Sequence, residues 1–248
     1  MPDSNLTALN VDSFELNVKG RQIHYLKAGR GRPVVLVHGG ASDSRDWLTT
    51  MRECGNSFTF YAPDLPGFGE SARDEAGYYL SDFSDFLLNF IETLKLDSPA
   101  LAGHSFGARV CLDAAMQPGN NISKLVLIDA SGLGRISLFG RFLFVFFSVL
   151  RKVQRQREPY PRFLTKAGVD WNYVGEEALR SIKIPTLLIW KNPDPYMPIA
   201  NARRAARLIP GAKLVVFDGY GHAPHQQKDI KEFTTLLQDF LNRDSRQT

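Results

Sequence analysis

The chain has 248 residues, of which 44% are apolar and 23% are charged, as in an ordinary globular protein. This composition excludes a fully disordered chain, a collagen-like repeat and a small disulfide-rich scaffold. The formal net charge is only +4, which by itself indicates no class of partner.

Eight short segments of the chain have the character of strands. The first two, 14–18 and 22–28, alternate in polarity, and the short polar connection Lys19-Gly20-Arg21 between them is typical of a hairpin. The other six are continuous apolar runs, which are typical of strands buried on both faces of a parallel sheet. These runs are Val34–Val37, Phe58–Ala62, Pro99–Ala102, Leu125–Ile128, Thr186–Trp190 and Leu214–Phe217.

Helical periodicity fills the gaps between these strands. Apolar residues recur with 3.6-residue spacing over 83–94 and 230–241, and a further helical run covers 109–116. Alternation of strands with helices predicts an α/β protein with a mostly parallel eight-stranded sheet, flanked by helices and antiparallel at its start.

The stretch from Gly132 to Ser181 interrupts this alternation, because it is rich in aromatic and basic residues and has no strand-like segment. We predict that 132–181 is a small helical cap inserted after the sixth strand, and that 1–131 with 182–248 form the core. The cap contains 9 Lys or Arg and 4 Asp or Glu, whereas the core contains 21 and 22. The excess positive charge therefore belongs to the cap.

The longest apolar stretch, Ile136–Leu150, lies in this cap and contains Arg141. It is shorter than the roughly 20 apolar residues that a membrane-spanning helix needs. We interpret it as a buried or interfacial helix, or as a cover over a pocket. A cap with one apolar and one basic side is compatible with weak contact to anionic lipid, and equally with a solvated face.

One motif has the pattern of a catalytic turn. Gly103-His104-Ser105-Phe106-Gly107 follows a predicted strand and precedes a predicted helix. G-x-S-x-G in that context is typical of a nucleophile elbow, in which a tight turn presents the serine hydroxyl at the start of a helix. Backbone N–H groups and the helix dipole favour negative charge at that place.

With this motif the chain resembles the α/β-hydrolase family, and the resemblance extends over about two hundred residues. His38-Gly39-Gly40 resembles the family's oxyanion loop, and Asp64–Ser71 resembles a strand-end loop. The segment Leu188–Asp194 resembles the strand that presents the acid, and Gly219–His225 the loop that presents the histidine. The order Ser, Asp, His along the chain is also the family's order.

The resemblance implies a role for each residue. Ser105 is the expected nucleophile, His222 the base and later the acid, and Asp194 the group that orients the imidazole. The N–H groups of Gly40 and Phe106 are the expected oxyanion donors, with Ala41 as the alternative second donor.

Other polar residues have competing interpretations. Asp129 also ends a strand, where some members of the family place their acid. We expect His225 at the surface or behind the catalytic residues, and His38 and His104 to orient backbone. Asp64 is expected to tie down its own loop, and Arg109 to lie on a helix surface or to be structural.

Two features of the sequence depart from the family's pattern. Lys191 stands where the acid loop usually opens with Gly, and it is expected either to alter the local electrostatics or to point outward. The cap is also short for the family.

A serine nucleophile favours acyl transfer to water, because the family's epoxide hydrolases and haloalkane dehalogenases use Asp at this position. We predict a carboxylesterase for esters with apolar or aromatic parts, with Ala41, Phe144 and Phe147 as substrate-binding residues. The alternative is a carbon–carbon bond hydrolase of aromatic ring-fission products. That subfamily commonly has Trp after the catalytic histidine, whereas Ala223 stands here. A non-catalytic ligand receptor is a further, less favoured alternative.

The remaining expectations concern partners and location. The sequence has no metal-ligand set and no dinucleotide fingerprint, so we predict no metal and no cofactor. Cys54 and Cys111 are expected to be buried or inert thiols without a disulfide. We expect a small-molecule ester as partner, no nucleic acid, no transmembrane segment, and a monomer or homodimer. The first twelve residues lack Lys, Arg and a long apolar run, which predicts a cytoplasmic protein without a signal peptide.

Overall fold

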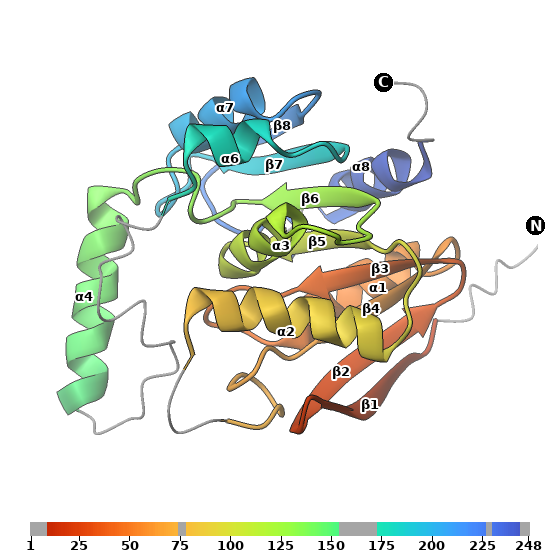
Figure 1. Cartoon of the computed structure of the whole chain (residues 1–248). Helices are drawn as coiled ribbons and strands as arrows, with labels where there is room; N and C mark the ends of the chain where they lie inside the picture. The colour runs from red at the N-terminus through yellow and green to blue at the C-terminus, as the bar shows by residue number, and fades with distance from the viewer. Residues whose placement is uncertain (1–8, 74–77, 154–172, 227–229, 244–248) are drawn as a thin grey trace, which may run out of the picture.

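A computed structural model describes residues 9–73, 78–153, 173–226 and 230–243 of the chain (Figure 1). Its centre is one eight-stranded sheet with the strand order β1-β2-β4-β3-β5-β6-β7-β8. The strands are β1 (Val11–Val18), β2 (Arg21–Gly29), β3 (Arg32–Val37), β4 (Phe58–Pro63), β5 (Ala100–His104), β6 (Lys124–Ile128), β7 (Thr186–Asn192) and β8 (Lys213–Asp218).

The pairing directions confirm the predicted sheet. β2 runs antiparallel to both β1 and β4, and every later pair is parallel. All residues of β5 and β6 are buried, which explains why these strands are continuous apolar runs in the sequence. β1, at the edge, is mostly exposed. The α/β fold with a mostly parallel sheet is therefore as predicted.

Helices cover both faces of the sheet. Figure 1 shows α2 and α3 on the near face, and α1 and α8 behind it. Each face has its own apolar core, with Phe83 and Phe90 on the first and Trp47 and Phe233 on the second. The helices are α1 (Leu48–Cys54), α2 (Leu80–Thr93), α3 (Phe106–Met116), α4 (Leu138–Val153), α6 (Glu176–Arg180), α7 (Ile199–Leu208) and α8 (Ile230–Asn242), with a 3-10 turn η1 (Ser44–Trp47).

Both cysteines belong to these cores. Cys54 and Cys111 are buried and form no disulfide. Burial raises the pKa of the Cys54 thiol to about 12 and raises that of Cys111 as well. Both side chains are therefore buried thiols, as the sequence predicts.

The predicted cap segment contains α4 and α6, which lie between β6 and β7 in the chain. α4 stands upright beside the edge of the sheet at which the parallel strands end, at the left of Figure 1. Residues 154–172 lie outside the described residues, so the cap's boundaries at 132 and 181 stay a prediction. None of the helices in the described part of the chain has both the length and the apolar character needed to cross a bilayer.

The start of α3 packs against β3 with no room for side chains. A Cβ on Gly107 would lie 2.3 Å from the carbonyl oxygens of both Val37 and His38, and one on Gly103 would lie 2.4 Å from the carbonyl oxygen of Gly107. Such distances are far below van der Waals contact, so glycine is required at both positions. The turn between β5 and α3 is therefore fixed by backbone contacts.

We expect Gly107→Ala to destabilise the protein by about 3 kcal/mol, because the added methyl group must push α3 away from β3. Urea unfolding followed by circular dichroism measures this loss. Gly175→Ala is the matched control, since nothing lies within 4 Å of its added Cβ and its φ is −64°. If Gly107→Ala loses no more free energy of unfolding than the control, the steric explanation is wrong.

Candidate active site

Ser105 lies in the turn between β5 and α3 with a φ of 51° and a ψ of −109°. This is a region that side-chain-bearing residues seldom occupy. Its N–H donates to the carbonyl oxygen of Ile128 at 2.8 Å, and its carbonyl oxygen accepts from the N–H of Ser131 at 3.1 Å. The strained turn is therefore held at both peptide groups by the neighbouring strand β6 and the loop after it.

The structure brings Ser105, His222 and Asp194 together in one chain of hydrogen bonds. His222 Nε2 lies 2.9 Å from Ser105 Oγ, and His222 Nδ1 lies 2.6 Å from Asp194 Oδ2. The three residues come from the loops that follow β5, β8 and β7. In open parallel sheets, sites form at these carboxyl ends of the strands.

The surroundings of Asp194 fix the tautomer of this imidazole. The other oxygen of Asp194, Oδ1, accepts from the N–H groups of Tyr196 at 2.7 Å and Met197 at 2.9 Å, and the side chain is fully buried. A carboxylate so placed accepts a proton-bearing Nδ1, which leaves Nε2 as the acceptor for the Ser105 hydroxyl. The arrangement can therefore withdraw the hydroxyl proton.

Two further side chains hold His222 in place. His104 Nε2 donates to the backbone carbonyl oxygen of His222 at 2.5 Å, and the Tyr196 ring meets the His222 imidazole edge-on at 5.0 Å. The sequence predicts that His104 orients backbone, which this bond bears out. The sequence predicts no role for Tyr196. The position of this residue, two residues after Asp194, was a signal that could have been used.

Asp129, the rival acid, makes a different contact. Its Oδ1 accepts from the N–H of Lys191 at 2.7 Å, while the acid that meets His222 Nδ1 is Asp194. Burial first, and then the negative charge of Asp194, raise the pKa of Asp129 well above its ordinary range. Burial therefore favours the neutral form of the Asp129 carboxyl.

The loop predicted to hold the oxyanion lies beside Ser105. A Cβ on Gly39 would be 3.7 Å from the Cβ of Ser105, and Gly40 and Ala41 follow directly. His38 is fully buried; its Nδ1 donates to the Gly39 carbonyl oxygen at 2.8 Å and its Nε2 accepts from the Leu65 N–H at 3.0 Å.

Phe106, the other expected donor, is the first residue of α3, and helix N-termini favour anions. Its ring packs against Phe68 at 6.4 Å and Phe83 at 5.2 Å. Phe68 was not singled out in the sequence, because its phenyl ring looks like that of any core residue. The donor roles of Gly40 and Phe106 stay predictions.

Asp64 ties its loop down, as expected. Its carboxylate accepts from the N–H groups of Ser44 at 2.7 Å and Glu70 at 2.8 Å and contacts His24 Nδ1 at 2.8 Å. A Cβ on Gly69 would collide with this carboxylate at 2.1 Å. The loop is thereby drawn tightly around one buried anion.

The structure decides between the two alternatives expected for each of two cationic residues. Lys191 does not point outward, since it is 1% exposed and lies in the strand that leads to Asp194. Its positive charge acts to lower the pKa of Asp129 against the effect of burial. Arg109 is structural and not a surface residue, because it is 8% exposed and its Nε donates to Asp113 Oδ1 at 2.8 Å.

His225 lies behind the site and not at the surface. It is fully buried, stacks on Trp47 at 4.4 Å between ring centroids, and faces His104 at 4.6 Å. Burial first, and then His222, lower the pKa of His225 to about 3. Burial also lowers the pKa of His104 well below its ordinary value, followed by the effect of His225. Both rings are therefore neutral.

Two groups of side chains within the described residues bring possible metal-ligand atoms within 4.8 Å of one another: Asp46, His104 and His225, and His104, Asp129 and His222. In the second group, His222 uses both nitrogens for Ser105 and Asp194. In the first, His104 Nδ1 and both nitrogens of His225 have no hydrogen-bond partner in the described structure. A reaction at Ser105 needs none of these free atoms.

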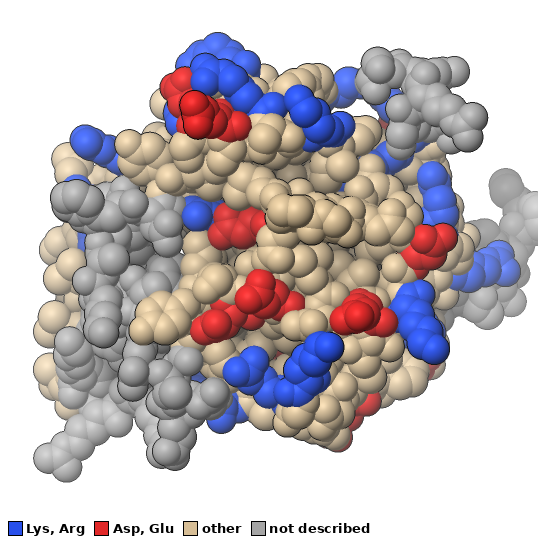
Figure 2. All heavy atoms as spheres, in the orientation of Figure 1, with Lys and Arg blue, Asp and Glu red and all other residues tan. Residues whose placement is uncertain are grey.

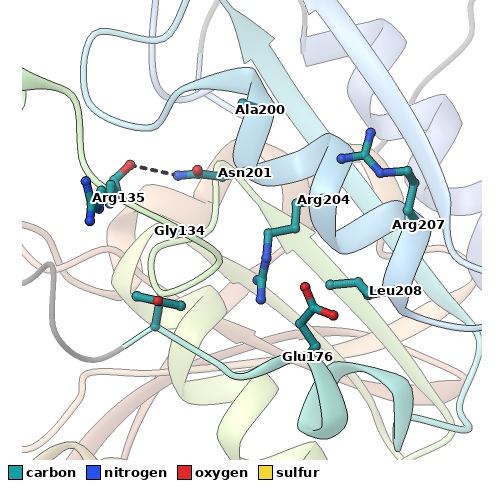
Figure 3. A pocket seen from close by; sticks show the side chains of 9 residues that line it. Gly134, Arg135, Glu176, Ala200, Asn201, Arg204, Arg207 and Leu208 are labelled. Atoms are coloured by element: carbon teal, nitrogen blue, oxygen red, sulfur yellow. Dashed lines mark hydrogen bonds between the residues drawn. The ribbon is translucent and has the colours of Figure 1, made fainter.

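A hollow of about 590 Å³ lies on the surface between α6, α7 and the segment around Gly134 (Figure 3). None of Ser105, Asp194 and His222 lines it. Figure 3 shows Arg204 pointing into it from α7. The guanidinium of Arg204 donates to the carbonyl oxygens of Leu133 at 3.2 Å and Val174 at 3.4 Å. Arg204 therefore already has backbone partners, and the hollow has no link to the catalytic residues.

The predicted substrate contacts belong to α4 and to the oxyanion loop. Ala41 directly follows Gly40 in this loop and is exposed. Phe144 and Phe147 lie on α4, but their side chains lie outside the described part of the structure. Their contact with substrate therefore stays a prediction.

A family model described as "Alpha/beta hydrolase family" matches residues 34–234. An uncharacterized protein of Mycobacterium tuberculosis is 24% identical over 91% of this chain and 80% of its own length. A 2-hydroxy-6-oxo-2,4-heptadienoate hydrolase of Pseudomonas putida is 27% identical over 86% of this chain and 90% of its own length. Among solved structures, a carboxylesterase of Bacillus subtilis has a TM-score of 0.79 with 19% identity, over 94% of this chain and 92% of its own.

We expect His225→Phe to make the protein less sensitive to acid. Below about pH 6.5 the unfolded chain protonates this histidine, whereas the folded protein, with a pKa of about 3, does not. Stability is therefore lost as the pH falls from about 6.5 toward 3, and at about pH 5 the cost is about 2 kcal/mol. Relative to wild type, the Phe variant regains this amount between about pH 8 and pH 5.

Urea unfolding at the two pH values measures this change. His225→Gln is the matched control. It also removes the titrating ring, but it loses the stacking on Trp47 at both pH values. If wild type and His225→Phe lose equal stability on acidification, the conclusion that the buried histidine is neutral is wrong.

Proposed function

The chain belongs to the alpha/beta hydrolase family, and we propose that it is a serine hydrolase that cleaves carboxylic esters with apolar or aromatic parts. The observation that carries this proposal is the continuous hydrogen-bonded path from Asp194 through His222 to Ser105. A hydroxyl at the tip of a strained turn, an imidazole within 2.9 Å and a buried acid behind it are the parts of a nucleophilic acyl-transfer site.

In the first half of the proposed reaction, Ser105 Oγ attacks the ester carbonyl carbon while its proton passes to His222 Nε2. The carbonyl oxygen becomes an oxyanion, which the N–H groups of Phe106 and Gly40 are proposed to bind, with Ala41 as the alternative to Gly40. Collapse of this intermediate breaks the bond to the leaving alkoxide, which takes the proton back from His222. The product of this half is an acyl-enzyme and a free alcohol.

In the second half, water takes the place of the alcohol. His222 Nε2 withdraws a proton from the water, whose oxygen attacks the acyl carbon. The second oxyanion collapses, Ser105 Oγ leaves with the proton from His222, and a carboxylic acid is released. Asp194 stabilises the positive imidazole in both halves and holds its orientation.

The preference for apolar substrate parts is the less direct element of the proposal. We propose that residues 132–181 form a cap over the site and that Phe144 and Phe147 contact the acyl group. Support comes from the position of α4 beside the edge at which the parallel strands end (Figure 1). Binding sites for small molecules are usually lined mainly by apolar side chains.

A second candidate activity is hydrolysis of a carbon–carbon bond in aromatic ring-fission products. It is favoured by the similarity to the Pseudomonas putida 2-hydroxy-6-oxo-2,4-heptadienoate hydrolase, which is 27% identical. Against it stands Ala223, which follows His222 where that subfamily commonly has Trp. Parallel assays of purified protein with nitrophenyl esters of increasing chain length and with a ring-fission dienone decide between the two. Faster turnover of the dienone would overturn the ester proposal.

We expect Ser105→Ala to lower ester turnover by about 10⁴-fold or more while the fold stays intact. Stopped assays with a nitrophenyl ester and circular dichroism measure the two effects. Ser181→Ala, on an exposed residue outside the site, is the matched control and should keep full activity. A folded Ser105→Ala protein with more than a trace of turnover would show that the nucleophile is elsewhere.

The two buried acids are expected to differ in the same assay. Asp194→Asn should lower kcat by about 10⁴-fold, because an amide cannot hold the Nδ1–H tautomer of His222. Asp129→Asn should lower it by less than about tenfold, because burial already favours a neutral carboxyl at that position. The reverse order of effects would assign the catalytic acid to Asp129.

A further inference from the structure

The surface of α4 is unusually apolar for a helix that faces solvent. In the described residues thirteen large apolar side chains are exposed, and eight of them lie on this one helix. Three of these, Leu138, Val153 and Val145, are 82%, 75% and 64% exposed. In Figure 2 tan atoms form the outermost left edge of the molecule, beside the grey atoms. Soluble proteins seldom expose a continuous apolar patch unless a membrane or another molecule covers it.

These eight side chains form one continuous face. At 100° per residue, these side chains lie within a single arc about 140° wide around the helix axis, and this arc contains no polar residue. In order around the arc they are Val145, Leu138, Val149, Phe142, Val153, Phe146, Phe139 and Leu150. The rings of Phe142 and Phe146 stack at 6.2 Å within it. The pattern is that of an amphipathic helix with its apolar side outward.

Charge selects what can cover this face. Residues 138–153 contain Arg141, Arg151 and Lys152 and no acidic residue, and Arg141 is exposed next to the arc. A symmetric pairing of two copies through α4 would offer Arg141 no acidic residue from the helix of the other copy. An anionic lipid surface offers hydrocarbon to the arc and negative charge to Arg141. With 16 residues, about 24 Å long, the helix is suited to lie in the interface.

We propose that α4 is an interfacial helix that binds the protein to the surface of an anionic lipid bilayer. The apolar arc enters the boundary between headgroups and acyl chains, and Arg141 contacts lipid phosphate. Because α4 lies beside the carboxyl ends of the parallel strands (Figure 1), the bound protein has this end of its sheet toward the bilayer. The interaction needs no substrate, so it stands or fails separately from the proposed esterase activity.

Co-sedimentation of the full chain with lipid vesicles tests this proposal. Wild type should bind vesicles of phosphatidylcholine mixed with phosphatidylglycerol, and bind pure phosphatidylcholine vesicles more weakly. Phe142→Ser should lower the partition coefficient about tenfold on both, because it removes one phenyl ring from the arc. Arg141→Gln should lower it about fivefold on the anionic vesicles only, an effect that added salt reproduces.

Matched controls lie on the edge strand β8, outside α4. Val216→Ser removes an apolar side chain that is 39% exposed on β8, and Lys213→Gln removes an exposed cation from the same strand. Both should bind vesicles like wild type. Equal losses in the controls and in the α4 variants would overturn the proposal. A second outcome would also overturn it: the wild-type protein does not bind vesicles and elutes as a dimer, and Phe142→Ser dissociates this dimer. The arc would then be a contact between two copies.

Discussion

Ser105 has a backbone conformation that costs free energy, and the rest of the site depends on the contacts that maintain it. Its N–H and carbonyl are bonded to β6 and to the loop that follows, while the missing side chains of Gly103 and Gly107 let α3 begin in contact with the backbone of β3. The direction of the serine hydroxyl follows from this turn. So does the place of the helix N-terminus at which negative charge can develop.

Several buried titratable groups lie around that turn. Burial lowers the pKa of His38, His104 and His225 and raises that of Asp129. Burial thus favours the uncharged form of each of these groups. Two of them act through backbone contacts, since His38 bonds two backbone groups and His104 bonds the carbonyl of His222. The hydrogen-bonded chain that reaches the Ser105 hydroxyl runs through His222 to Asp194.

Much of this was accessible from the sequence, because the strands are apolar runs and the site residues follow them directly. The strand ends place Ser105, Asp194 and His222 at one edge of a parallel sheet, so three loops far apart in the chain had to meet. Burial of single polar residues was not accessible in the same way. Lys191 and His225 look like surface residues in sequence, and only tertiary packing against neighbouring strands and Trp47 removes them from water. For α4 the sequence left a buried and an interfacial helix open, since periodicity gives the apolar face but not the side on which the core lies.

The histidine of the site follows β8, which is the last strand of the sheet and has a neighbour on one side only. Edge strands open locally at a lower free energy than central ones, so fraying of β8 would carry His222 away from Ser105 while the remaining strands stay paired. The bond from His104 at the centre of the sheet to the backbone of His222 spans this gap. Loss of function by heat therefore need not wait for loss of the fold, and this bond opposes such an early loss by tying the loop after the edge strand to the end of β5.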